Sequence, residues 1–179
     1  MVAIKSLLLF TTTVLATAIP RDVHATGYEL LYSDLVSLDQ SVEALTAAVN
    51  AYTSGNGAAV FSAVSYVNET NRKGYYDAMS DRVAVQNFND SLTISQYVST
   101  PIAVDITTGV QAIIAKKDPL VANGLRQQVL DGLNLLVSDH ETFSAAVAAK
   151  LNPAALLVAA LPVVEIDAAI RTAIADFTL

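Results

Sequence analysis

The stretch LYSDLVSLDQSVEALTAAVNAY, residues 31–52, decides the fold of this chain. Its apolar residues recur at alternating spacings of four and three, which places them on one stripe of a helix: Leu31, Leu35, Leu38, Val42, Leu45, Val49 and Tyr52. Thr26 and Glu29 form a capping-box pattern before the stretch, and the sequence SGNG at 54–57 is typical of a turn after it. We therefore expect a long amphipathic helix with one buried face.

Four more segments show helical periodicity, at residues 58–79, 100–117, 118–150 and 152–177. The last three each begin at an X-Pro pair, and proline is favoured at the first position of a helix. We expect Pro162 to kink or divide the final helix. The run from Ala154 to Val164 is apolar on every side, which predicts that it is buried or lies against something apolar.

The connections between these segments are short. Residues 80–91 are polar and irregular, with Val83, Val85 and Phe88 expected to anchor them to the core, and residues 92–98 predict a short helical turn. No segment is rich in strand-forming residues, and short connections favour antiparallel neighbours. The sequence therefore predicts an all-α fold, a single domain built as a roughly five-helix antiparallel bundle.

The N-terminus has the layout of a secretory signal peptide. A positive start is followed by an apolar run through Leu15 and by the small-x-small pattern Ala16-Thr17-Ala18. The run is too short to cross a bilayer. We expect residues 1–18 to be removed, leaving a mature domain at 19–179 that is secreted, extracellular or in the cell wall.

Two N-glycosylation sequons agree with export, at Asn68 and Asn89. Asn89 lies in the segment expected to be irregular, whereas Asn68 lies within a helical pattern. Asn89 is therefore the better candidate.

Composition limits the class of partner. The chain has no cysteine and a formal net charge of −7, without a basic stripe. Acidic charge disfavours nucleic acid and anionic membrane surfaces. We expect no transmembrane segment, because the apolar runs ending at Leu15 and Val164 are both too short for a span. Any affinity for lipid must come from apolar contact.

Catalytic and metal-binding groups are scarce. The only histidines are His24 and His140, no Gly-x-Ser-x-Gly motif is present, and the absence of cysteine excludes thiol chemistry. Asp139, His140 and Glu141 are adjacent, so on a helix their side chains diverge by about 100° each and cannot converge on one ion. We expect no enzymatic activity, no metal and no cofactor.

His140 falls on an inner stripe, between Leu136 and Phe143. One interpretation is a hydrogen-bonded core histidine; the other is a polar group that receives a carboxylate inside an apolar channel. The Ala-rich faces also have two interpretations, either dense helix packing or a ligand tunnel between helices. The candidate apolar lining comes from the inner stripes: Leu38, Val42, Leu45, Val64, Val67, Ile106, Val110, Ile113, Leu133, Leu136, His140, Phe143, Ile166 and Ile170.

The order and spacing of several helical patterns resemble the fungal hydrophobic surface-binding protein A family, which includes antigenic cell-wall galactomannoproteins. The likeness covers nearly the whole mature chain and rests on Arg21-Asp22-Val23, Ser33 to Tyr52, Ile113 to Lys117, Val129 to Lys150 and Ile174 to Phe177. The resemblance implies a secreted, non-enzymatic helical bundle that binds fatty acid or other lipid in a central cavity, or hydrophobic surfaces. The alternative it implies is a structural wall mannoprotein or surface coat that recruits secreted polyester hydrolases without enclosing a ligand.

Overall fold

The computed structural model describes residues 27–179, so the expected signal peptide and Thr26 of the capping box lie outside the described residues. Helices make up nearly all of this part, which contains no strand. Their order is α1 (Tyr28–Ala51), α2 (Ala58–Met79), α3 (Phe88–Tyr97), the π-helical turn η1 (Val98–Ile102), α4 (Ala103–Ala115), α5 (Lys117–Ala122), α6 (Arg126–Ala148) and α7 (Leu156–Thr178).

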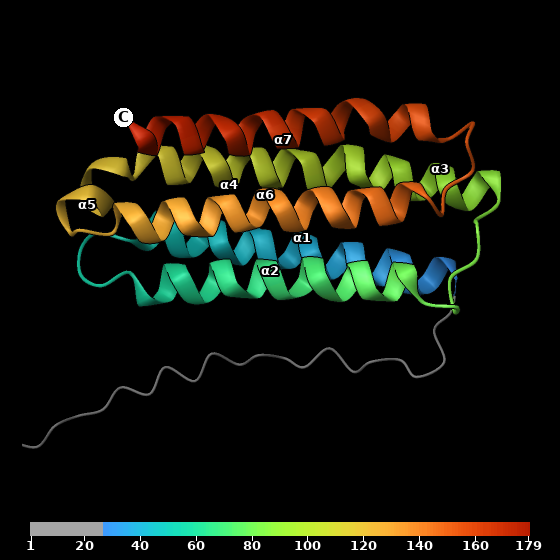
Figure 1. Cartoon of the computed structure of the whole chain (residues 1–179), viewed down its shortest axis with the longest axis horizontal. Coiled ribbons are helices and arrows are strands. Elements are labelled where there is room, and N and C mark those ends of the chain that lie inside the picture. The colour runs from blue at the N-terminus through green and yellow to red at the C-terminus, as the bar shows by residue number, and fades with distance from the viewer. Residues whose placement is uncertain (1–26) are drawn as a thin grey trace, which may run out of the picture.

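Five long helices close into a ring around a single interior. In the ring α1 packs on α2, α2 on α6, α6 on α7, α7 on α4, and α4 on α1. Consecutive long helices run in opposite directions (Figure 1). Because five helices cannot all alternate around a closed ring, some neighbours, such as α2 and α6, run parallel. The expected five-helix all-α bundle is confirmed.

α1 buries the predicted stripe, and its inner residues from Leu31 to Tyr52 are all in the core. The helix begins after Gly27, whose φ of 60° stops it from extending further back, and its start has no side-chain cap within the described residues. Gly57, with a φ of 65°, makes the turn into α2. A side chain there would also collide with Phe61 and Leu125.

The segment after α2 differs from the sequence expectation in two respects. Val83 is buried as predicted, but Val85 and Phe88 are exposed and anchor nothing. The predicted short turn is a ten-residue helix, α3, that begins at Phe88, because the Asn87 side chain accepts from the Asp90 N–H and caps it. Asn89 therefore lies in the first turn of a helix and not in a loop.

The third predicted helix begins at the expected place. The backbone is extended at Thr100 (φ −160°, ψ 112°), so the helical conformation is interrupted there between α3 and α4.

The run Phe88–Ala115 is long and apolar enough to cross a membrane, the one such run in residues 27–179. Its inner residues Ile94, Ile102 and Ile106 are buried in the bundle core, as expected for a core helix of a folded domain.

The boundaries of the last two predicted helices are corrected. Asp118-Pro119 lies in the short α5, and Gly124 with a φ of 75° separates α5 from α6. Likewise, a turn follows Asn152-Pro153 before α7 begins at Leu156. α7 continues through Pro162 and is not divided there as expected. A long, packed helix can lose the one backbone hydrogen bond that proline removes and still continue.

Buried charges tie α1 to its neighbours. Lys73 Nζ donates to buried Asp34 on α1 and, at 2.8 Å, to Asp77 on its own helix. Tyr97 Oη donates to Asp39 Oδ2 at 3.0 Å. Burial nevertheless raises the pKa of Asp39 to about 6, outweighing that hydrogen bond.

Candidate binding cavity

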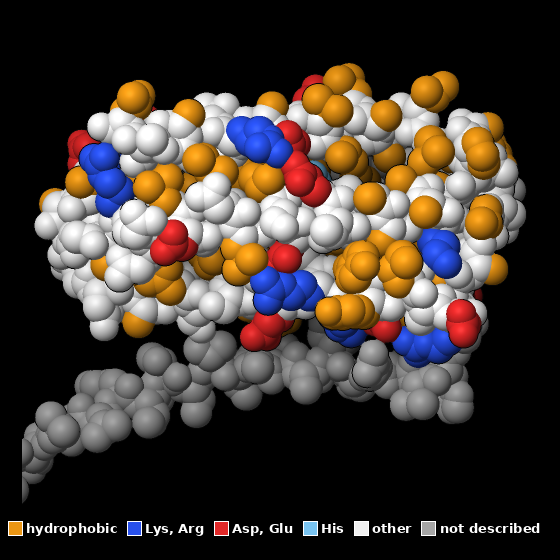
Figure 2. Space-filling model, viewed as in Figure 1, with side chains coloured by type: hydrophobic (Ala, Val, Ile, Leu, Met, Phe, Trp, Pro, Cys, Tyr) orange, Lys and Arg blue, Asp and Glu red, His pale blue; other side chains and the backbone are white. Residues whose placement is uncertain are grey.

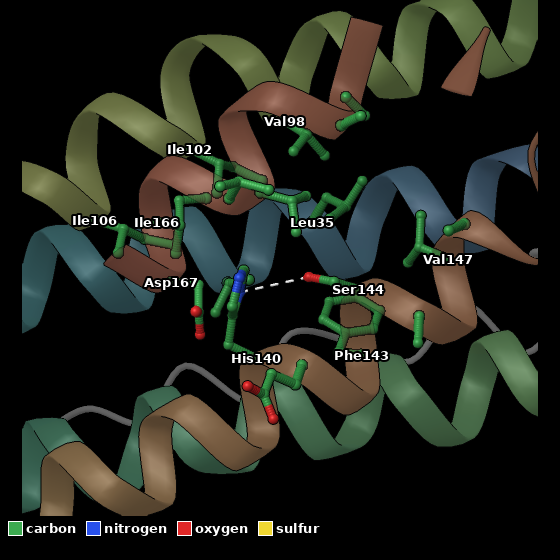
Figure 3. A pocket seen from close by; sticks show the side chains of 18 of the residues that line it. Leu35, Val98, Ile102, Ile106, His140, Phe143, Ser144, Val147, Ile166 and Asp167 are labelled. Atoms are coloured by element: carbon green, nitrogen blue, oxygen red, sulfur yellow. Dashed lines mark hydrogen bonds between the residues drawn. The ribbon is translucent and has the colours of Figure 1, made fainter. Parts of the chain in front are cut away.

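A cavity of about 590 Å³ lies inside one half of the ring. Its walls come from the first half of α1, η1, the start of α4, the second half of α6 and the first half of α7. Figure 3 shows Leu35, Ile102 and Ile166 on the wall facing His140. The volume lies within the range of about 300–1,000 Å³ that is typical of small-molecule sites.

Small side chains keep the cavity open between α6 and α7. Ala145 and Ala148 lie on the α6 side and Ala159 and Ala160 on the α7 side, all lining the cavity. Ala145 and Ala160 are also exposed, so this gap is the mouth of the cavity. Larger side chains at these positions would fill the space between the two helices.

His140 is the main polar group inside the cavity. It is buried, and its Nδ1 lies 3.4 Å from Ser144 Oγ, one helical turn along α6 (Figure 3). Its Nε2 makes no hydrogen bond of normal geometry among the described residues, although the Val163 carbonyl lies close enough to the imidazole to influence its pKa. Burial lowers the pKa of His140, partly opposed by the nearby Val163 carbonyl and the Asp167 and Glu141 carboxylates. The His140 imidazole is therefore neutral at pH 7, with one nitrogen able to donate and the other able to accept.

A charged cluster borders this polar end. Arg171 Nε donates to Asp167 Oδ2 at 2.7 Å, and Arg171 Nη2 donates to Glu141. The cluster joins α7 to α6 across the bundle surface. Asp167 and Glu141 also line the cavity, so carboxylates as well as His140 lie at its polar end.

The predicted lining residues divide between this cavity and a closely packed interior. Five of the fourteen line the large cavity: Leu38, Ile106, His140, Phe143 and Ile166. The others line two further cavities of about 20 Å³ each: Val42, Leu45, Val64, Val67, Val110, Ile113, Leu133, Leu136 and Ile170. Each of the two small cavities has room for about one water molecule. One half of the interior of the bundle is therefore packed and the other half is open.

Sequence reasoning missed the mouth of the cavity. The residues it did not select include Ser144, Ala148, Ala160, Val163 and Asp167. The signal available for them was the Ala-rich character of the two helices. Periodicity cannot show on which side of an alanine the space remains.

The apolar run Ala154–Val164 is not enclosed by the bundle. Ala155 and Ala159 face the core, whereas Leu157, Leu161 and Val164 are 83%, 64% and 63% exposed. Because their spacings are four and three, these three form one line on the outer side of the helix, here named the α7 crest. Apolar side chains gather over this part of the surface in Figure 2.

The two sequons have different surroundings. Asn89 is exposed at the start of α3, whereas Asn68 is 5% exposed and packed within α2. A glycan at Asn68 would have no room in the folded bundle, so Asn89 stays the predicted site.

In residues 27–179 no three His, Asp or Glu side chains lie together as a metal site would require.

Comparisons with known proteins fit this architecture. The family model for hydrophobic surface binding protein A matches residues 29–149, while no curated protein matches the chain significantly. Ligand binding domain 1 of the Penicillium marneffei MP1 protein, complexed with arachidonic acids, is similar at 19% identity with a TM-score of 0.79 over 84% of this chain and 97% of that one.

Two other solved structures are similar. Domain 2 of the same protein, with multiple arachidonic acids, has 16% identity and a TM-score of 0.79 over 86% of this chain and 97% of its own. AFMP4P in complex with palmitic acid has 25% identity and a TM-score of 0.76 over 84% of this chain and 99% of its own. The match of the family model over most of the described helices shows that the chain belongs to the hydrophobic surface binding protein A family.

Proposed function

We propose that this protein is a non-enzymatic binder of fatty acids, holding the acyl chain in the cavity between α6 and α7. The observation that carries the proposal is a cavity of about 590 Å³ whose lining is apolar except at His140, Glu141, Ser144 and Asp167. Similar folds in the MP1 domains and AFMP4P hold arachidonic or palmitic acid. An apolar space with one polar end matches the shape of such a ligand.

The polar end suits the head of a fatty acid. Neutral His140 can donate from Nε2, which makes no hydrogen bond of normal geometry in the described residues, while Ser144 lies beside its other nitrogen. In that tautomer Nδ1 accepts from the Ser144 hydroxyl, whose oxygen can in turn accept from a protonated head. The Asp167 and Glu141 carboxylates at the same end disfavour an ionised head, and Arg171, bonded to both, offsets one of their two negative charges.

The energetics are sufficient for useful affinity. Burying about 14 methylenes yields roughly 11 kcal/mol at ~0.8 kcal/mol each, of which association and ordering remove about half. Hydrogen bonds to the carboxylate return about 1.5–3 kcal/mol. The sum of about 8 kcal/mol corresponds to a Kd in the micromolar range.

A matched pair of tryptophan variants tests the proposal. Ala160 and Ala168 are both exposed on α7, but only Ala160 lines the cavity. Ala160→Trp should place an indole in the mouth and weaken palmitate binding about tenfold or more by calorimetry, because its ring fills space the acyl chain needs. Ala168→Trp should change the affinity less than about twofold. Equal affinities in both variants would contradict binding at this cavity.

We further propose that the protein is exported and acts outside the cell, as the signal-peptide pattern and the exposed Asn89 sequon suggest.

A second candidate function, a surface coat that recruits secreted hydrolases, is favoured by the exposed α7 crest. It predicts adsorption to polyester from dilute solution even when Ala160→Trp blocks the cavity. Loss of adsorption together with ligand binding would contradict it.

A further inference from the structure

The α7 crest and the mouth of the cavity form one continuous apolar surface. Val164 belongs to both, since it is exposed on the crest and also lines the cavity. Ala160 lies between Leu157 and Val164 along the helix and lines the mouth. The sequence PAALLVAALPVV at residues 153–164 has no polar side chain, so along α7 the apolar surface runs without interruption from the crest to the opening.

The chemistry of this surface selects the kind of partner. A protein interface usually provides about one hydrogen bond per 100–200 Å², and twelve consecutive residues here offer no side chain able to make one. An anionic surface would be repelled by the net charge of −7. An uncharged lipid surface can take up the exposed leucine and valine of the crest, which itself carries no charged group that would lose water.

We propose that the α7 crest docks on an uncharged lipid surface and holds the cavity mouth against it, so that a fatty acid passes between surface and cavity without crossing water. The transfer step rests on the proposed function, whereas the docking step does not. The first charged side chains beyond the crest, Glu165 and Asp167, mark where the docked surface ends and water begins.

Flotation with triolein droplets coated with phosphatidylcholine tests docking. Leu157→Gln/Leu161→Gln should reduce droplet binding by at least about tenfold, because two exposed leucines no longer leave water. Glutamine has a helix propensity close to that of leucine, so the fold should persist, as circular dichroism can verify. The control Met79→Gln/Val85→Gln changes two other exposed apolar residues, on the α2 side, and should bind like the unmodified protein.

Several outcomes would overturn docking. They are no flotation of the unmodified protein, equal flotation of the crest variant, or an equal loss in the control. Sedimentation tests a second copy as the occupant. If the unmodified protein is a dimer and the crest variant a monomer, the crest is a contact between copies and the proposal is wrong.

Transfer kinetics separate this inference from the proposed function. A fluorescent anthroyloxy-palmitate is loaded on the protein and mixed with droplets that carry a quencher. Direct transfer predicts a rate that rises in proportion to droplet concentration, and a slower, concentration-independent rate in the crest variant with unchanged probe affinity. Normal probe binding with a concentration-independent rate overturns direct transfer alone. Failure to take up the probe refutes the proposed function and direct transfer with it, while flotation still decides docking.

Discussion

Gly74 on α2 supports the cavity wall from behind, so an added methyl group there should alter both stability and ligand binding. A Cβ at Gly74 would lie 2.6 Å from Cε2 and 2.8 Å from Cε1 of Phe143, and closer still to Cζ. Phe143 is 2% exposed and lines the cavity on its other side. The ring can make room for the methyl group only by moving into the cavity.

The size of the effect follows from two opposing terms. Replacing glycine by alanine in a helix stabilises by about 1 kcal/mol, whereas overpacking a buried site costs about 1–3 kcal/mol. Gly132→Ala on α6 is the matched control, because its Cβ would meet Val64 Cγ1 at 3.2 Å, a contact that a small shift relieves. Gly74→Ala should therefore be less stable than Gly132→Ala by about 2 kcal/mol, or about 4–8 °C in Tm.

The ligand assay distinguishes this mechanism from simple loss of stability. Room lost for one methylene corresponds to about 0.8 kcal/mol, or about fourfold in Kd. Palmitate titrated at a temperature where both variants are fully folded should bind at least about fourfold more weakly to Gly74→Ala than to Gly132→Ala. Equal melting temperatures and equal affinities would refute the assignment of Gly74 as the support of Phe143.

Three further tests use variants of the buried charges and of the sequons. The pKa of Asp39 is about 6 in the folded protein against 3.8 unfolded. Protonation of Asp39 therefore stabilises the fold fully below pH 3.8, and this contribution is lost as the pH rises through about 6. Asp39→Asn should raise Tm at pH 7 and leave it unchanged near pH 3.5. Lys73→Met removes the cation that buried Asp34 and Asp77 share, while Asp77 keeps Arg82 at 2.8 Å, and should destabilise by about 1–3 kcal/mol in urea unfolding. Arg171→Met, at an exposed pair, should have little effect. In secreted protein, intact mass should show glycan loss for Asn89→Gln and none for Asn68→Gln.

The apolar periodicity predicted the ring because it records which face of each helix is buried. The stripe from Leu31 to Tyr52 and the bounds of α2 agree with the structure. Helix starts were predicted less well, since X-Pro pairs indicate that a helix can begin there without saying how long it continues. Asp118-Pro119 opens only the six-residue α5, and Gly124 ends it.

The open half of the interior could not be located from periodicity. An inner stripe looks the same whether its neighbours fill the space or leave it empty. Phe143 lines the large cavity while Leu133 lies in packed interior, although both continue the same stripe of α6. The difference arises opposite them, where Ala159 and Ala160 leave room that the larger Val60 and Phe61 do not.

Native mass spectrometry of the protein purified from culture medium shows directly whether the cavity holds a fatty acid. Binding in the cavity predicts a fraction whose mass exceeds that of the glycosylated chain by one fatty acid, lost on denaturation, and a further increase in that fraction after addition of palmitate. Protein that is empty as purified and stays empty after addition of palmitate or oleate would contradict it.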